Sequence, residues 1–235
     1  MADPAPAAVT APHLFSTAPG PAGESALSLN KAEQARAAAM ADDQRRATYE
    51  SARMLWRQGA RAFTQALGME CPDFSQLPAH GAITPHDGAF CSSLCHTDSL
   101  VLVAFSKGAI GVDAEPVTRT PPWEALARRW FTTSETDWLR HQNQPRDAFL
   151  TLWTLKEAWI KATGRGIAGN LQALFFSPER NRLVLDQPDP SWCVATTTSQ
   201  SHRIGVIWQG GAAPEWWHDG NACNVHWHRL EVDEP

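Results

Sequence analysis

One segment, residues 153–161, constrains the fold of this chain more than any other. Its sequence, Trp-Thr-Leu-Lys-Glu-Ala-Trp-Ile-Lys, has a helical composition with no internal Gly or Pro, and Gly164 follows where such a helix would end. Trp153, Glu157 and Lys161 are spaced four residues apart and therefore lie on one face of the predicted helix. A carboxylate and an ammonium are thus presented one turn apart, although the same pattern is also typical of an ordinary surface ion pair.

A second acidic element, Ile-Gly-Val-Asp-Ala-Glu, lies earlier in the chain at residues 110–115. Residues 99–105 are nearly all apolar, as in a buried strand, and the Ser-Lys-Gly that follows predicts a hairpin turn into a second strand over residues 109–115. On that strand Asp113 and Glu115 point to the same side. Two carboxylates so close are unfavourable unless a proton or a cation lies between them, and Mg²⁺ prefers oxygen ligands of this kind. The same spacing also occurs on many surface strands.

The N-terminal part of the chain predicts an arm followed by two helices. Residues 1–27 are rich in Ala and Pro and show no periodicity, which predicts a disordered or loosely attached arm. Helices are predicted over residues 31–40, with Asn30 as the N-cap, and from residue 43 to about residue 67, with Gly68 at its end.

The second of these helices carries the densest positive charge in the chain. Arg46, Arg53 and Arg57 lie within about 40° of one another on a helical wheel, and they are flanked by Arg45 and Arg61. Two interpretations stay open for this cluster. It is either a solvated face with Glu50 as a partial counter-charge, or an anion site, because guanidinium groups bind phosphate with two parallel hydrogen bonds.

The remaining sequence predicts an α+β fold of two halves joined near Pro116. Residues 69–98 are predicted to be mostly loop. Helices are predicted over residues 123–131, from a cap at Thr133 or Ser134 to about His141, and from about residue 146 to 163. Strands are predicted over residues 174–177, 182–185, 192–197, 203–208 and 223–228.

Composition argues against several classes of protein. The 235 residues carry a formal net charge of −5, so there is no global bias toward nucleic acid or anionic membranes. No apolar run approaches the roughly 20 residues of a membrane span, and the first residues do not resemble a signal peptide. The five Cys predict no disulfide framework and favour a cytoplasmic location. Cys91-x-x-x-Cys95-His96 has no second pair at zinc-site spacing, and His226-x-His228 is interpreted as a packed or exposed pair.

Five segments taken together resemble a known family. Ile110-Gly-Val-Asp-Ala-Glu115, Trp130-Phe-Thr-Thr-Ser-Glu135 and the segment at 153–161 look like the ordered motifs of the 4′-phosphopantetheinyl transferases, of the larger, monomeric, two-lobed type. Arg45-Arg-Ala-Thr-Tyr-Glu-Ser-Ala-Arg53 and Ser93-Leu-Cys-His-Thr-Asp98 resemble the branch that serves enterobactin synthesis. The resemblance covers roughly residues 29–176.

This resemblance implies both a fold and a reaction. The fold would consist of two similar α/β lobes related by a pseudo-two-fold axis, residues 28–115 and 116–235, with the active site in the cleft between them. The reaction would move the phosphopantetheine arm of coenzyme A to a serine of an apo acyl or peptidyl carrier protein, with Mg²⁺, releasing adenosine 3′,5′-bisphosphate. Residues 123–138 are our prediction for the surface on which the carrier protein docks.

The resemblance also implies roles for individual residues. At the metal end, three carboxylates would hold Mg²⁺ against the coenzyme A diphosphate: Asp113, Glu115 and Glu157. Glu157 would in addition draw the proton from the serine, and Lys161 would steady the diphosphate with Lys156 close by. At the adenosine end, the side chains that would contact the 3′-phosphate are those of Arg45, Arg53 and His96. Glu135 is predicted to support the site without ligating the metal.

Two departures from the family pattern bear on coenzyme A binding. The family usually has a Gly-basic-x-Pro element before the histidine motif, whereas residues 80–85 here read His-Gly-Ala-Ile-Thr-Pro, with no Lys or Arg. Cys95 stands where the family has Ser, and a thiol is the weaker hydrogen-bond donor. Two other functions stay open: a non-catalytic module that binds coenzyme A or a carrier protein, and a metal-dependent phosphohydrolase.

Overall fold

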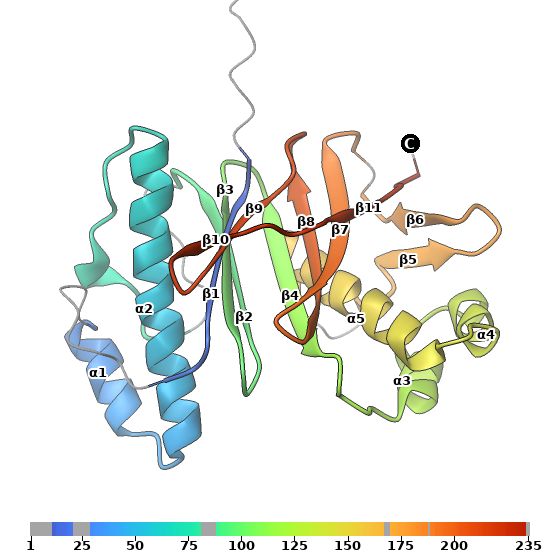
Figure 1. Ribbon diagram of the computed structural model, residues 1–235, viewed down its shortest axis with the longest axis horizontal. Coiled ribbons are helices and arrows are strands. Elements are labelled where there is room, and N and C mark those ends of the chain that lie inside the picture. The colour runs from blue at the N-terminus through green and yellow to red at the C-terminus, as the bar shows by residue number, and fades with distance from the viewer. Residues whose placement is uncertain (1–10, 21–28, 81–87, 167–169, 188, 234–235) are drawn as a thin grey trace, which may run out of the picture.

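The computed structural model describes residues 11–20, 29–80, 88–166, 170–187 and 189–233. Two antiparallel-rich sheets lie face to face, and each carries a long helix on its outer side (Figure 1). The layers therefore run helix, sheet, sheet, helix, which confirms the predicted α+β class.

The first sheet has five strands in the order β10-β9-β1-β3-β2. Their bounds are His13–Thr17 (β1), Cys91–His96 (β2), Val101–Ser106 (β3), Glu215–His218 (β9) and Asn221–Cys223 (β10). Helix α2, Asp43–Ala66, covers its outer face, and α1, Lys31–Ala38, lies beside α2; a short 3₁₀ turn, Phe74–Gln76, follows. The helix and sheet bury an aromatic core that includes Trp56, Phe63 and Phe105.

The second sheet has four strands in the order β11-β7-β8-β4. Their bounds are Ile110–Pro116 (β4), Trp192–Ser199 (β7), His202–Gln209 (β8) and His228–Leu230 (β11). Helix α5, Pro145–Ala162, covers this sheet, and beyond α5 lie two short helices and a separate hairpin (Figure 1). These are α3 (Trp123–Trp130), α4 (Thr133–Arg140), β5 (Leu174–Ser177) and β6 (Arg182–Leu185).

Between the two sheets lies a third apolar core, to which β4 contributes every second residue. Ile110, Val112 and Ala114 face this core, so Asp113 and Glu115 face the opposite way, toward α5. Gly111 lies on the α5 side as well, and a Cβ built there would be 1.8 Å from the carbonyl oxygen of Ala158. The missing side chain lets α5 approach the strand closely, which brings the acidic face of β4 under the helix.

Three expectations about strands are wrong. Residues 13–17 do not belong to a loose arm, because β1 pairs with β3 and β9 in the middle of the first sheet; residues 1–10 and 21–27 of that predicted arm lie outside the described part. Residues 91–96 form strand β2 within a region expected to be mostly loop. β3 and β4 are consecutive but do not form the predicted hairpin. β3 pairs with β1 and with β2 in the first sheet, whereas β4 pairs with β8 in the second sheet.

Smaller differences occur near the C-terminus and at α4. The single strand predicted over residues 223–228 is wrong; that region instead ends β10 and leads into β11. Helix α4 is capped by Thr132, one residue before the earliest predicted cap, and Glu135 completes a capping box. The division into lobes at residues 115 and 116 stays a prediction, although β4 and β9 each pair with strands of the other chain half.

Candidate active site

The two acidic segments singled out in the sequence meet between β4 and α5. Lys161 Nζ donates hydrogen bonds to Asp113 Oδ1 at 2.7 Å and to the carbonyl oxygen of Val112 at 3.1 Å. Two glycines allow α5 to pack closely on the second sheet, Gly111 on β4 and Gly205 on β8. A Cβ built at Gly205 would lie 3.0 Å from the backbone of Thr154. Residues 48 positions apart are therefore joined by a charge-assisted contact.

The carboxylates around Lys161 share an unfavourable electrostatic environment. Burial raises the pKa of Asp113, and Lys161 opposes that shift. Burial also raises the pKa of Glu157, and the negative charge of Asp113 raises it further. The pKa of Glu115 is raised by burial, against the effect of its ion pair with Arg119. For Lys161, burial acts to lower the pKa, but Asp113 and other acidic groups outweigh it and the pKa is raised.

The donor chemistry of this group fits a hard divalent cation, while a complete ligand arrangement is absent. Within the described ranges, no three or more His, Cys, Asp or Glu side chains are arranged to hold a metal ion. Asp113 and Glu115 are paired with Lys161 and Arg119, and the Glu157 carboxylate has no hydrogen bond or ion pair to any described residue. Three carboxylates with raised pKa values are nevertheless what a divalent cation stabilises.

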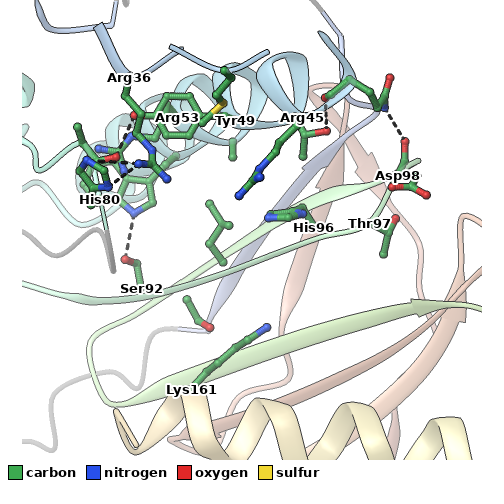
Figure 2. A pocket seen from close by; sticks show the side chains of 18 of the residues that line it. Arg36, Arg45, Tyr49, Arg53, His80, Ser92, His96, Thr97, Asp98 and Lys161 are labelled. Carbon is green, nitrogen blue, oxygen red and sulfur yellow. Dashed lines mark hydrogen bonds between the residues drawn. The ribbon is translucent and has the colours of Figure 1, made fainter. Parts of the chain in front are cut away.

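A pocket of about 1050 Å³ opens beside this group and extends to α2 (Figure 2). Arg45 and Tyr49 line it from α2, His96 from the end of β2, and Lys161 from α5. Burial lowers the pKa of His96, and the charge of Lys161 lowers it further. Lys161 is thus the member of the group between β4 and α5 that lines this pocket together with Arg45 and His96, whereas Asp113, Glu115 and Glu157 are not among its lining residues.

Comparison with known proteins assigns the central part of the chain. Residues 109–207, from β4 to β8, match the model of the 4′-phosphopantetheinyl transferase superfamily. This part of the chain is similar to the members of that superfamily. Helix α5 and the Asp113–Lys161 contact both lie within the matched residues.

Individual superfamily members match over part of the chain. The 4′-phosphopantetheinyl transferase HetI of Nostoc sp. is 30% identical over 54% of this chain and 55% of its own length, and psf-1 of Bacillus pumilus is 32% identical over 54% and 56%. The chain therefore spans about half the length of the curated relatives it matches. A solved holo-[acyl-carrier-protein] synthase of Thermotoga maritima aligns with a TM-score of 0.36 and 20% identity over 44% of this chain and 64% of that one. The enterobactin-associated branch stays a prediction.

Arg53 was predicted to contact the 3′-phosphate of coenzyme A. Its guanidinium forms hydrogen bonds within the protein. Its side chain is 4% exposed, and Nε donates to Glu33 Oε1 at 2.5 Å while Nη2 donates to the carbonyl oxygen of Pro78. Arg57 binds the other oxygen of the same carboxylate. Glu33 also accepts from the backbone N–H of Asn30 at the start of α1, so this buried cluster joins α1 to α2.

Lys156 is enclosed on a different side of α5 from Glu157 and Lys161, and its predicted place close to the diphosphate stays a prediction. Its ammonium is fully buried, 2.9 Å from Glu135 Oε1, and donates to the carbonyl oxygens of Leu171 and Leu174. Burial lowers the pKa of Lys156 and Glu135 opposes that shift. Every hydrogen bond of this ammonium is therefore made to the protein.

Glu135 has the supporting place that the superfamily resemblance predicts. Its carboxylate accepts from the backbone N–H groups of Thr132 and Phe176, both at 2.9 Å, in addition to Lys156. The residue is fully buried, so no oxygen faces the pocket. The pair Glu135–Lys156 fixes α4 and β5 against α5.

Sequence reasoning missed several side chains near the site. Arg119 pairs with Glu115, and its position four residues later was the available signal. Glu33 could have been found from the Asn-x-x-Glu capping pattern at Asn30, although its buried ion pairs could not. Cys95 lies in the core between the sheets, where burial raises the pKa of its thiol to about 12.

The described part of the chain contains no helix of sufficient length and apolarity to cross a membrane.

Proposed function

We propose that this protein transfers the 4′-phosphopantetheine group of coenzyme A to a serine of an apo acyl or peptidyl carrier protein, with Mg²⁺, releasing adenosine 3′,5′-bisphosphate. The observation that carries the proposal is the contact of Asp113 with Lys161, which lines the same pocket that Arg45 lines from α2. The similarity of residues 109–207 to the superfamily supports the same reaction class.

The shape and charge of the pocket suit coenzyme A. Its volume, about 1050 Å³, lies at the upper end of the range of about 300–1,000 Å³ for small-molecule sites. Cationic side chains lie at both ends, Arg45 on α2 and Lys161 on α5, which matches a ligand with phosphates at two places. His96 lies between these ends and carries a lowered pKa, so near neutral pH it can contact the ligand as a neutral donor or acceptor.

The carboxylates have distinct tasks in this proposal. Asp113, Glu115 and Glu157 would hold the divalent ion, which supplies neutralisation of the diphosphate charge when bound. Lys161 is fixed by Asp113 and offsets charge on the phosphate oxygens as the bond to the leaving group breaks.

Glu157 is the residue we assign to the serine proton. The serine Oγ forms a bond to the phosphorus of the phosphopantetheine group, the bond from that phosphorus to adenosine 3′,5′-bisphosphate breaks, and the serine proton passes to the Glu157 carboxylate directly or through water. No described side chain forms a hydrogen bond or ion pair with the Glu157 carboxylate, and its raised pKa makes it a stronger base than an exposed glutamate.

Partner, location and assembly state are parts of the same proposal. The apo carrier protein is expected to dock near α3 and α4, where Arg129 stacks on Trp130 at 4.7 Å. We expect a monomer that works in the cytoplasm.

The test is incubation of the protein with coenzyme A, Mg²⁺ and an apo carrier protein, followed by mass measurement of the carrier. A mass gain of one phosphopantetheine group is expected, and it should disappear when Mg²⁺ is chelated. Coenzyme A binding without any gain would favour the non-catalytic module. Release of adenosine 3′,5′-bisphosphate in the absence of carrier would favour the phosphohydrolase.

A further inference from the structure

The cationic side chains that line the pocket differ in whether the protein already neutralises them. The pocket wall includes five such groups: Arg36, Arg45, Arg53, Lys161 and Arg165. Three have an acidic partner at ion-pair distance, since Arg53 binds Glu33, Lys161 binds Asp113, and Arg165 binds Asp186. An ion pair leaves little net charge to attract a ligand anion.

Arg36 and Arg45 have no acidic partner in the described ranges. The guanidinium of Arg36, on α1, contacts the ring of His80 through Nη1 and lies 5.5 Å above the ring of Tyr49. Its Nε is buried and has no hydrogen-bond partner. The side chain of Arg45 forms no hydrogen bond or ion pair with the described residues, and its backbone N–H bonds to Asp42. These two guanidinium groups are therefore the Arg and Lys side chains of the pocket wall that have no acidic partner in the described ranges.

Arg36 is also held in place before a ligand arrives. Tyr49 is fixed by its own hydrogen bond to the carbonyl oxygen of Ala79 at 3.1 Å, and its ring supports the guanidinium from one side. His80 contacts the guanidinium through its ring nitrogens. A guanidinium confined in this way loses less side-chain entropy when it binds a phosphate than an exposed lysine would.

The position of Arg36 is significant because His80 begins the segment in which a basic residue is missing. Residues 80–85 contain no Lys or Arg, although the family resemblance leads one to expect a phosphate contact there. Arg36 reaches His80 from α1, and Figure 2 shows Arg36, Tyr49 and His80 gathered at one end of the pocket while Lys161 enters from another side. Arg36 therefore places a positive charge beside His80 at that end of the pocket.

We propose that Arg36 is a specificity-determining residue that, with Arg45, selects coenzyme A carrying a 3′-phosphate, in place of Arg53 and of the missing basic residue. This inference rests on the proposed function, because it takes coenzyme A as the ligand. The diphosphate belongs to the Lys161 end, so the phosphate that remains for the α1 end of the pocket is the 3′-phosphate.

The test compares the affinities of coenzyme A and 3′-dephospho-coenzyme A by titration calorimetry, without any carrier protein. The parent protein should bind coenzyme A at least about tenfold more tightly, the scale of one hydrogen bond to a charged group. Arg36→Met, which keeps the length of the side chain and removes its charge, should reduce this preference by about tenfold or more. Arg36→Lys should retain part of it.

Arg165→Met is the matched control, because Arg165 lines the same pocket but is neutralised by Asp186. It should leave the preference for the 3′-phosphate unchanged. Circular dichroism of each variant establishes that the fold is intact, and if Arg36→Met does not fold, Arg36→Gln takes its place in the comparison.

Three results separate the two levels of the proposal. A preference that Arg36→Met and Arg36→Gln leave intact overturns the role of Arg36 and leaves the transferase proposal standing. Equal affinity of the parent protein for both coenzymes, together with phosphopantetheine transfer to a carrier, does the same. A parent protein that binds neither coenzyme and transfers nothing overturns the proposed function itself.

Discussion

Replacing Lys156 by Met should strongly lower the free energy of unfolding of this protein. The pocket should keep its lining, because Lys156 is not one of the residues that line it. The substitution removes an ammonium that donates to Glu135, Leu171 and Leu174, and it leaves the fully buried carboxylate of Glu135 without its cation. Breaking a buried ion pair by removing one partner costs about 3–5 kcal/mol. For a chain of this length each kcal/mol corresponds to about 2–4 °C in Tm, so a decrease of about 6–20 °C is expected.

The measurement is urea unfolding followed by tryptophan fluorescence, with coenzyme A affinity measured separately on the folded variant. Lys161→Met is the matched control, because it makes the same change five positions later on the same helix. Lys161 is partly exposed, and Asp113, whose pKa is already raised, can take up a proton when its partner is lost. The control should therefore lose less stability but much more transferase activity.

The reasoning about Lys156 would be refuted by the opposite pattern. If Lys156→Met unfolds at nearly the parent urea concentration and binds coenzyme A more weakly, then Lys156 contacts the ligand in solution. In that case the enclosed ion pair with Glu135 is not the state in which the protein works.

Four further substitutions test the remaining parts of the site. Glu157→Gln should reduce transfer by about 10²–10⁴-fold, the usual contribution of a general base. Because the folded-state pKa of Glu157 is raised, its charge costs stability above that pKa; the variant should thus be more stable near pH 7, and the gain should vanish as the pH falls toward the ordinary value of 4.5. Arg53→Met should lower stability by about 1.5–3 kcal/mol through the loss of its charged hydrogen bond to Glu33, which keeps Arg57 as a partner, and a stable variant that binds coenzyme A more weakly would contradict this. Gly111→Ala should destabilise the protein more than Gly205→Ala in thermal unfolding, since its Cβ would lie 1.8 Å from the α5 backbone against 3.0 Å; equal losses would contradict the close approach.

The elements of the site were predictable from local sequence, while their partners were not. The strand at residues 110–116 and the helix at residues 145–162 follow from periodicity and helix-end signals, with boundaries shifted by one residue. Periodicity does not specify which strand pairs with which, so β4 was expected in a hairpin with β3 and instead pairs with β8. β1 escaped prediction because its few apolar residues lie in an Ala- and Pro-rich stretch, and its partners β3 and β9 are far away in the sequence.

The roles of the charged residues were the hardest part to predict, because a charge can be neutralised by a residue from another element. Arg45 and Arg53 are both arginines of α2, yet Glu33 on α1 binds Arg53 and does not bind Arg45. Nothing in the spacing of the arginines carries that information. It depends on how α1 packs on α2, which the sequence pattern leaves open.

Helix α5 shows the same limit within a single motif. Lys156 and Glu157 are adjacent in the sequence, but successive residues of an α-helix are about 100° apart around the axis, so adjacent side chains face different surroundings. Lys156 therefore points toward α4 and β5 and forms an ion pair with Glu135, while Glu157 and Lys161, one turn apart, face β4. Gly111 allows α5 to pack closely against β4, and this packing places Lys161 beside Asp113 while Lys156 is enclosed with Glu135. A motif that contains Lys, Glu and Lys thus encodes one structural ion pair and one face to which we assign the reaction, and the packing of the helix sets the division between them.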